Sequence, residues 1–355
     1  MASFLITPFL SPDTVNIANC SWIKVFDNDE RNYYHQGLVV TGVLSEIFLL
    51  WLNLTLMCTL LWKDVNYRHF ALFTGTACLR RLSWGLISLP TFRHLDRITK
   101  SNLLPCVTFA QHDCFFSVLE LEGLTHVCID RYVMARYAAN KWRMDKPFSY
   151  LYMVSTLMFA LVYTFIPSFR YGGSFNYDLS CTTCGVNMLL PNNYQRFIVL
   201  TLFFMRSVKP VLVMTSSLAR AYYLDSNVCT DPEAEQRKRF TRNLIILTAV
   251  TLLSWLPLGV IRGYVIFGQL FYDKRYIIDS MAGFGETINS AMFLYWASPV
   301  FMAITAMLVD KNIRYNMINL FASAKLAAEI ANQEDEKTEK ERTNEIEKPK
   351  EKKSQ

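Results

Sequence analysis

Seven segments of the chain are apolar over a length that can cross a membrane. An apolar stretch needs about 20 residues in an α-helix to span the hydrocarbon core of a bilayer. The seven segments cover residues 37–62, 69–92, 103–137, 148–167, 194–224, 237–267 and 277–309. Charged residues interrupt the second and third segments, so a simple hydropathy cut-off would miss them. The pattern predicts an all-α membrane protein built as a seven-transmembrane helix bundle.

Polar residues flank this apolar region at both ends. Residues 311–321 alternate polar and apolar side chains at helical spacing, which predicts a short amphipathic eighth helix on the inner membrane face. The helical domain is therefore expected over residues 37–322. Residues 323–355 are rich in charge and are expected to form a disordered cytoplasmic tail. Residues 1–36 are expected to be an extracellular N-terminus, with a glycosylation sequon at Asn19.

Composition and charge narrow the class of protein. Apolar residues make up 52% of the 355 positions and aromatic residues 14%, more than a typical soluble domain contains. The formal net charge of +6 is modest, and because the basic residues flank apolar segments, we expect no nucleic-acid partner. More of them lie on the side of Arg131, which places that side in the cytoplasm. The nine cysteines show no zinc-site spacing. We expect a multi-pass protein of the plasma membrane, in contact with lipids and with no bound metal.

The third segment carries the most specific motif of the chain. Cys106 stands near its start, and the triplet Asp130, Arg131 and Tyr132 stands 25 residues after that cysteine. At about 1.5 Å per residue, this separation is slightly more than one bilayer thickness. The segment resembles the third helix of rhodopsin-like G-protein-coupled receptors. The resemblance implies that the triplet lies at the inner face and that Arg131 contacts a heterotrimeric G protein. The prediction of seven helices also rests partly on this resemblance.

Two other passages are similar to opsins in particular. Residues 241–257 resemble the sixth opsin helix, including Trp255 and Pro257, and residues 167–187 resemble the second outer loop. In that alignment Cys184 forms a disulfide with Cys106, and Asp178 takes the place of an acidic loop residue near the ligand. The resemblance covers about residues 37–322 and implies a receptor that is not an enzyme.

The chain departs from opsins at the residues that hold retinal. Opsins bind retinal covalently through a lysine of the seventh helix; Met292 stands at that position, and no lysine occurs between Lys274 and Lys311. The counterion position is Phe109. We therefore expect no covalent retinal and no other cofactor. The chain is then interpreted as a receptor for a small-molecule, chemosensory ligand, similar to the opsin-like serpentine chemoreceptors of nematodes. The alternative is an opsin-like photoreceptor or photoisomerase that holds retinal without a covalent bond.

The candidate ligand site lies on the inward face of the third segment. Asp113 follows Cys106 by seven residues and shares its face with Phe109, Phe116 and Ser117. In receptors for biogenic amines an aspartate at this spacing binds the ligand ammonium, but Asp113 could instead pair with Arg262 or His112. The predicted ligand-binding residues are Asp113, Phe109, Phe116, Ser117, Asp178, Trp255 and Met292. The aromatic members could equally be ordinary packing.

Charged residues inside the membrane require partners. Arg81 stands where this superfamily has a sodium-binding aspartate, and Glu120 stands where the same pocket has a small hydroxyl residue. Because an intramembrane charge costs about 2.5–3.5 kcal/mol or more, we predict that Arg81 pairs with Glu120. Glu122 should face Arg206 or Lys209 of the fifth segment, unless it reaches headgroups or water.

Two further departures concern the inner face. The acid of the sixth helix that would hold the third-helix arginine appears as Arg237, and Glu235 is a poorer partner. Loss of this lock is expected to lower the cost of the active state. The terminal seventh-helix motif has Met302 in place of its tyrosine, which removes an active-state contact. The net effect on basal activity does not follow from the sequence.

Two competing interpretations give the chain a different role. One is a protein that keeps the fold but no longer couples to a G protein, and the other is an ion-conducting or transport protein. The intramembrane charges prompt the second interpretation, but the chain has no internal repeat that would favour transport.

Overall fold

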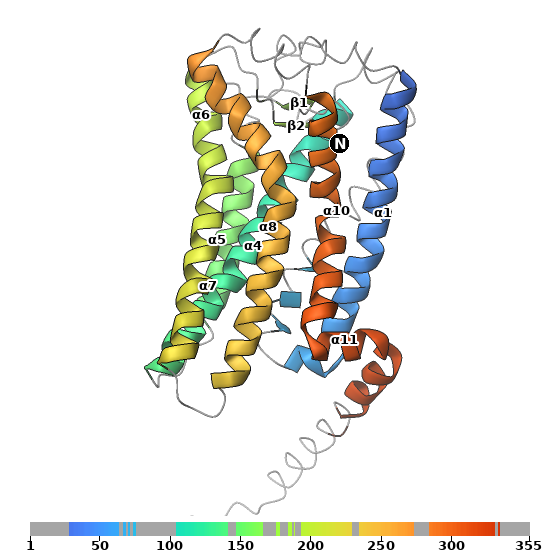
Figure 1. The fold of residues 1–355 in the computed structure, drawn as a ribbon, viewed down its shortest axis with the longest axis vertical. Coiled ribbons are helices and arrows are strands. Elements are labelled where there is room, and N and C mark those ends of the chain that lie inside the picture. Colours follow the sequence, from blue (N-terminus) through green and yellow to red (C-terminus); the bar gives the residue numbers. More distant parts are fainter. Residues whose placement is uncertain are drawn as a thin grey trace, which may run out of the picture.

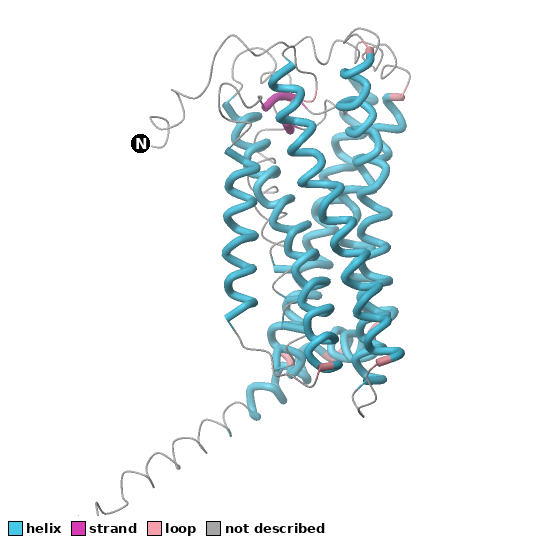
Figure 2. The backbone as a smooth tube through the Cα atoms, turned by 90° about the vertical axis from the view of Figure 1, so that its left-hand side faces the viewer, coloured by secondary structure: helices cyan, strands magenta, loops and turns pink. Residues whose placement is uncertain are grey.

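Long helices packed side by side make up most of the part of the chain that the structure covers. This computed structural model describes residues 28–63, 67–68, 70–71, 74–75, 104–140, 147–165, 175–177, 184–186, 188, 193–228, 234–272, 284–330 and 333. Figures 1 and 2 show the helices running nearly parallel, with a small hairpin at one end of the bundle. The long helices are α1 (Asn28–Cys58), α4 (Leu104–Ala139), α5 (Pro147–Phe165), α6 (Asn193–Phe203), α7 (Lys209–Asn227), α8 (Ala234–Phe271) and α10 (Gly285–Val309).

Contacts between neighbouring helices define their order around the bundle. Helix α10 packs between α1 and α8, α8 also contacts α7, and α4 contacts α5, α7 and α8. The largest core cluster joins Leu56 of α1, Leu124 of α4, Leu247 of α8 and Met302 of α10, all nearly inaccessible to solvent. Their burial removes apolar surface from contact with water or lipid and fixes the helix faces that point inward.

Six of the seven apolar segments coincide with described helices, and α1 and α8 extend beyond the predicted bounds. Helix α1 begins at Asn28, before the predicted boundary at residue 37, because its polar first turns continue the helix past the apolar part. Helix α8 likewise adds residues at both ends of the predicted 237–267. Residues 320–330 are helical too and pass the predicted end of the helical domain at residue 322.

Within the described residues, four helical stretches are both long and apolar enough to cross a membrane. They are residues 40–58, 196–227, 234–271 and 286–309, and a shorter apolar helix covers 154–165. Helix α4 has the length but not the apolarity, as its acidic residues led us to expect. An all-α membrane protein is therefore confirmed, and the count of seven spans stays a prediction.

Only a few residues of the second predicted segment are described, and they sit close to α1. The amide of Asn53 donates to the Ala71 carbonyl at 2.9 Å and to the Thr74 hydroxyl at 3.0 Å. These bonds fix the first part of this segment on α1. Arg81 and the remainder of the segment lie outside the described residues, as does Asn19.

Helix α11 (Lys311–Ile318) follows α10 and turns across the end of the bundle opposite the hairpin (Figure 1). Asp310 caps it: its carboxylate accepts from the backbone N–H groups of Asn312 and Ile313 at 2.9 and 3.1 Å. Ile313 and Met317 are buried on its inner side, and the Trp51 indole of α1 donates to the Met317 carbonyl at 3.2 Å. The amphipathic helix is present where the pattern predicted it; its location on a membrane face stays a prediction.

A two-stranded hairpin covers the other end of the bundle. Strands β1 (Phe175–Tyr177) and β2 (Cys184–Val186) are antiparallel, with Tyr177 opposite Cys184, and both contact α4. Asp178, between the two strands in the sequence, lies outside the described residues. The side chains of Cys106 and Cys184 are not described either, so the disulfide between these two cysteines stays a prediction.

Candidate functional site

The predicted site residues of α4 line up below the hairpin. Asp113 and Phe116 are half-buried and Ser117 is buried. The Phe116 ring contacts the His112 ring in a tilted arrangement, with centroids 4.6 Å apart. Phe109 lies in α4, but its side chain is not among the described ones. The structure therefore brings Asp113, Phe116 and Ser117 to one stretch of α4, at the level of a cavity described below.

Met292 is placed differently from the prediction. It is 2% exposed and packs in a cluster with Leu258, Tyr295 and Trp296 between α8 and α10. It does not line either of the two cavities described below. Met292 thus fills the α8–α10 contact, and its role in ligand binding stays a prediction.

A π-helical turn in the fifth segment places an arginine inside the bundle. The turn, η7 (Phe204–Val208), widens the helix just before Pro210, whose ring prevents a regular backbone hydrogen bond. Arg206 lies in this turn and donates hydrogen bonds to the Ser117 hydroxyl and to the Cys114 thiol, the latter at 3.5 Å. The sequence predicted Arg206 as a possible partner of Glu122, and its bonds to Ser117 and Cys114 were not predicted.

A small cavity of about 50 Å³ lies beside Arg206, under the hairpin. It is lined by Cys114, Tyr163, Val186, Met188, Val199, Leu202, Phe203, Arg206, Ser207, Arg262 and Ile266. Asp113, Arg206 and Arg262 all lie within electrostatic range of the Cys114 sulfur. Arg206 and Arg262 line this outer cavity, whereas Asp113 lies near Cys114 without lining the cavity. The charge of the lining therefore favours an anion over the amine that Asp113 suggested.

The other inward-facing cation of the fifth segment has a carboxylate partner. Lys209 Nζ lies 2.6 Å from Oε1 of Glu122, and the ammonium also lies over the Phe159 ring, 5.0 Å from its centre. The Glu122 side chain is 4% exposed. The prediction that Glu122 faces the fifth segment is confirmed, with Lys209 rather than Arg206 as its partner. This pair occupies the α4–α5–α7 contact.

Glu120 is buried in α4 with 3% of its surface exposed. A carboxylate at this depth requires a favourable partner. Because Arg81 lies outside the described residues, the Arg81–Glu120 pair stays a prediction.

Arg131 is held by an ion-pair network at the end of the bundle opposite the hairpin. One of its terminal nitrogens, Nη2, lies 2.6 Å from Oδ2 of Asp225 in α7, and its Nε donates to the Thr241 hydroxyl of α8 at 2.7 Å. Thr241 in turn donates to Asp225 at 2.9 Å, and Arg237 of α8 lies 3.5 Å from the second Asp225 oxygen. The Asp225 side chain is fully buried and that of Arg131 is 2% exposed. These four residues, called the Arg131 latch below, tie α4, α7 and α8 together.

The latch corrects one expectation from the sequence. The interpretation that Arg131 has lost its lock is wrong, because Asp225 of α7 supplies the acid that α8 lacks. The customary α8 acid is replaced by Arg237, and this arginine pairs with the same aspartate. Of the flanking triplet residues, Asp130 is 6% exposed and Tyr132 packs against the Ala135 cluster between α4 and α7.

Trp255 connects the two proline-containing helices. Its indole N–H donates to the Ser298 hydroxyl of α10 at 3.1 Å, one residue before Pro299. Pro257 lies two residues further along α8, where it removes a backbone donor. The Trp255 ring also packs at 5.2 Å from Tyr295. Movement of α8 at this level must therefore rearrange a buried α8–α10 contact.

Comparison with known proteins identifies the fold. No protein-family model matches the chain, and no curated protein matches its sequence. Among solved structures, squid rhodopsin superposes with a TM-score of 0.69 over 88% of this chain and 92% of the rhodopsin chain, at 13% sequence identity. The bundle thus has the opsin-like fold of G-protein-coupled receptors, and this neighbour is a receptor rather than an enzyme. Within the described residues no group of three or more His, Cys, Asp or Glu side chains could hold a metal ion.

Proposed function

We propose that this protein is a plasma-membrane receptor that binds a small molecule and activates a heterotrimeric G protein. Its N-terminus would be extracellular, and the Arg131 latch would lie at the cytoplasmic face. The observation that carries the proposal is the latch itself: a buried arginine held between three helices by one carboxylate. An arginine this deeply buried has little structural advantage over an apolar residue, so a role as a releasable contact is the better explanation.

The proposed mechanism is a shift between two arrangements of the bundle. A ligand in the outer cavity would contact α4, the π turn and α8, and would favour the arrangement that it binds more tightly. Outward movement of α8 would separate Thr241 and Arg237 from Asp225 and expose Arg131 to a G-protein helix. Trp255, whose indole bridges α8 and α10, lies between the cavity and the latch and would couple the two.

The same contacts support a ligand that is not covalent retinal. The residues of α10 include no lysine, and the Lys209 ammonium is paired with Glu122 outside the outer cavity. Neither α10 nor the lining of the outer cavity therefore supplies a lysine for a Schiff base. A chemosensory role is consistent with a chain that has the Arg131 latch but no lysine in α10 that could bind retinal.

The experiment that tests this proposal is guanine-nucleotide exchange catalysed by the purified full-length protein in nanodiscs. Wild-type protein should accelerate exchange on at least one class of G protein, and Arg131→Ala should reduce the acceleration about tenfold or more, because Arg131 makes the contact with the G protein. Arg196→Ala removes an arginine near the other end of the bundle and should stay within about twofold of wild type. Exchange at the level of empty nanodiscs with every class of G protein would refute the proposal.

A further inference from the structure

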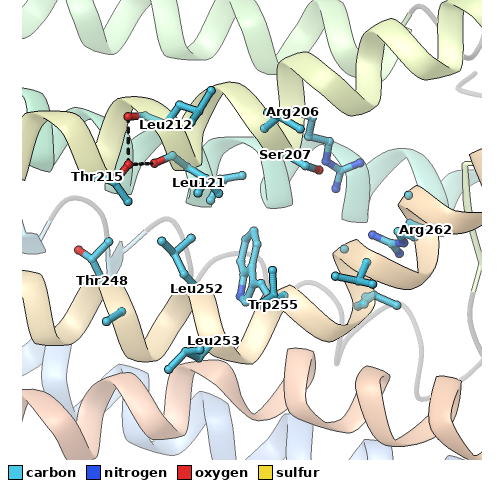
Figure 3. A pocket seen from close by; sticks show the side chains of 18 of the residues that line it. Leu121, Arg206, Ser207, Leu212, Thr215, Thr248, Leu252, Leu253, Trp255 and Arg262 are labelled. Carbon is cyan, nitrogen blue, oxygen red and sulfur yellow. Dashed lines mark hydrogen bonds between the residues drawn. The ribbon is translucent and has the colours of Figure 1, made fainter. Parts of the chain in front are cut away.

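A long apolar groove runs between α7 and α8 and ends at two arginines. Its volume is about 960 Å³. The wall from the fifth segment extends from Phe203 to Ala219, roughly 24 Å of helix at about 1.5 Å per residue. Leu252, Leu256 and Gly259 form part of the α8 wall, and Trp255 projects into the space between the two helices (Figure 3). The groove is long enough for an extended hydrocarbon chain.

The groove opens on the outer surface of the bundle and extends inward as far as buried Leu121 and Tyr295. Leu212, Leu253 and Val260 line it and are 62%, 65% and 60% exposed. In a membrane protein such residues face lipid. A ligand dissolved in the membrane could therefore enter this groove sideways, without passing through water.

The polar end of the groove is shared with the outer cavity. Arg206, Ser207 and Arg262 line both spaces. Figure 3 shows Arg206 and Arg262 facing the same end of the groove from the fifth segment and α8, with the leucines farther along. A molecule lying in the groove would therefore place one end at two guanidinium groups and could reach the outer cavity from there.

The charge at this end is suited to an anion. The Arg206 guanidinium donates to the Ser117 hydroxyl and to the Cys114 thiol, and neither of these groups neutralises its positive charge. The ion pairs found among the described residues do not include Arg206. An arginine inside the membrane is unfavourable unless it is compensated, so a carboxylate delivered by a ligand would be bound strongly.

Arg206 and Arg262 lie too deep below the helix ends for the phosphate of a membrane phospholipid to reach them, whereas a single-chain acid can. From Arg262 to the end of α8 at Phe271 the helix rises roughly 14 Å, and from the start of α6 at Asn193 to Arg206 it rises roughly 20 Å. The phosphate of a lipid in the bilayer stays at the level of the helix ends. A single-chain acid has no glycerol backbone to keep it there and can bring its carboxylate down to the arginines.

We propose that the groove between α7 and α8 is a binding site for a single-chain amphiphilic carboxylate, whose carboxylate is held by Arg206 and Arg262 and whose hydrocarbon chain lies along Trp255 and the leucines. The site deepens the proposed function by naming the chemical class of the ligand. Binding itself rests on the groove and its arginines and does not require that the protein activate a G protein.

The test is equilibrium binding of radiolabelled oleate to the purified full-length protein in nanodiscs, with oleyl alcohol as the uncharged competitor. Oleate should bind saturably, and oleyl alcohol should compete about tenfold more weakly or worse, because it cannot form charge-assisted hydrogen bonds. Arg206→Gln should weaken oleate binding about tenfold, and Arg206→Lys should weaken it less. Arg220→Gln removes an exposed arginine of α7 outside the groove and should leave binding unchanged.

A second variant tests the groove independently of charge. A Cβ added at Gly259 meets no atom within 4 Å, so Gly259→Phe fills the groove without disturbing the backbone and should abolish saturable binding. Val154→Phe adds similar bulk at a 58% exposed position of α5 and serves as its control.

Non-saturable uptake of radiolabelled oleate, or equal competition by unlabelled oleate and oleyl alcohol, would overturn the proposed site. Either result would mean that oleate only joins the lipid at the protein surface. If oleate binds as expected but never changes nucleotide exchange, the site stands and the proposed signalling function fails. If exchange depends on Arg131 while oleate does not bind, the function stands and the ligand class is wrong.

Discussion

Asp225→Asn is expected to raise ligand-independent nucleotide exchange about tenfold. Asparagine keeps the shape of the side chain but removes the charge that holds Arg131 and Arg237. A hydrogen bond to a charged group contributes about 1.5–3 kcal/mol, and about 1.4 kcal/mol shifts a two-state equilibrium tenfold. Because the bonds to Asp225 join α4, α7 and α8, their loss weakens the closed arrangement, while Arg131 remains available to a G protein.

Glu235→Gln is the matched control for this variant. Glu235 is an exposed acid in the first turn of α8, and on sequence grounds it is the nearest candidate acid for Arg131 in that helix. The same chemical change there should leave basal exchange within about twofold of wild type, since Asp225 carries the latch. Lower exchange in Asp225→Asn than in wild type would mean that Asp225 acts in the active arrangement and would contradict the assignment.

Asp310→Ala is expected to cost about 3 kcal/mol of stability. The buried Asp310 carboxylate caps α11 through two backbone N–H groups, accepts the Tyr67 hydroxyl at 3.0 Å and lies 3.5 Å from the Asn243 amide. Loss of an N-cap contributes about 0.5–2 kcal/mol, and each buried donor left without a partner adds about 1 kcal/mol or more. Thermal unfolding of the purified protein in detergent measures the effect.

Tyr67→Phe separates the contributions within this network. It removes a hydroxyl that donates to Asp310 and accepts from the Asn312 amide at 3.3 Å. It preserves the edge contact of the ring with Phe240, whose centroid is 5.6 Å away. The variant should lose about 1 kcal/mol, well below the loss in Asp310→Ala. Equal losses in the two variants would show that the cap of α11 adds nothing and that the tyrosine contact alone matters.

Periodic apolar runs were sufficient to predict most of the helices, and angular position on a helix was sufficient for one ion pair. Each described apolar run became a helix because a chain in lipid must satisfy its backbone internally. Glu122 was predicted to face the fifth segment, and it pairs with Lys209 there. Such a prediction needs only the regular geometry of α4.

The features that escaped prediction depend on distances between helices. Arg206 and Lys209 stand three residues apart, which places both on one face even of a regular helix. The sequence therefore could not decide that Lys209 pairs with Glu122 while Arg206 bonds to Ser117. Asp225 stands at the polar end of α7, where an acidic residue is ordinary, so only its proximity to Arg131 reveals its role. The groove residues looked like ordinary lipid-facing side chains, because sequence carries no measure of the space between two helices.

The distance between α4 and α8 at the latch provides the most direct test of the claim that Arg131 and Asp225 hold a switch closed. Spin labels introduced as noncanonical residues at exposed Asn140 and Arg239 leave every native cysteine in place. Pulsed electron resonance should give one short distance for wild type and for Glu235→Gln, and a second, longer population for Asp225→Asn. Identical distance distributions in wild type and Asp225→Asn would contradict the account.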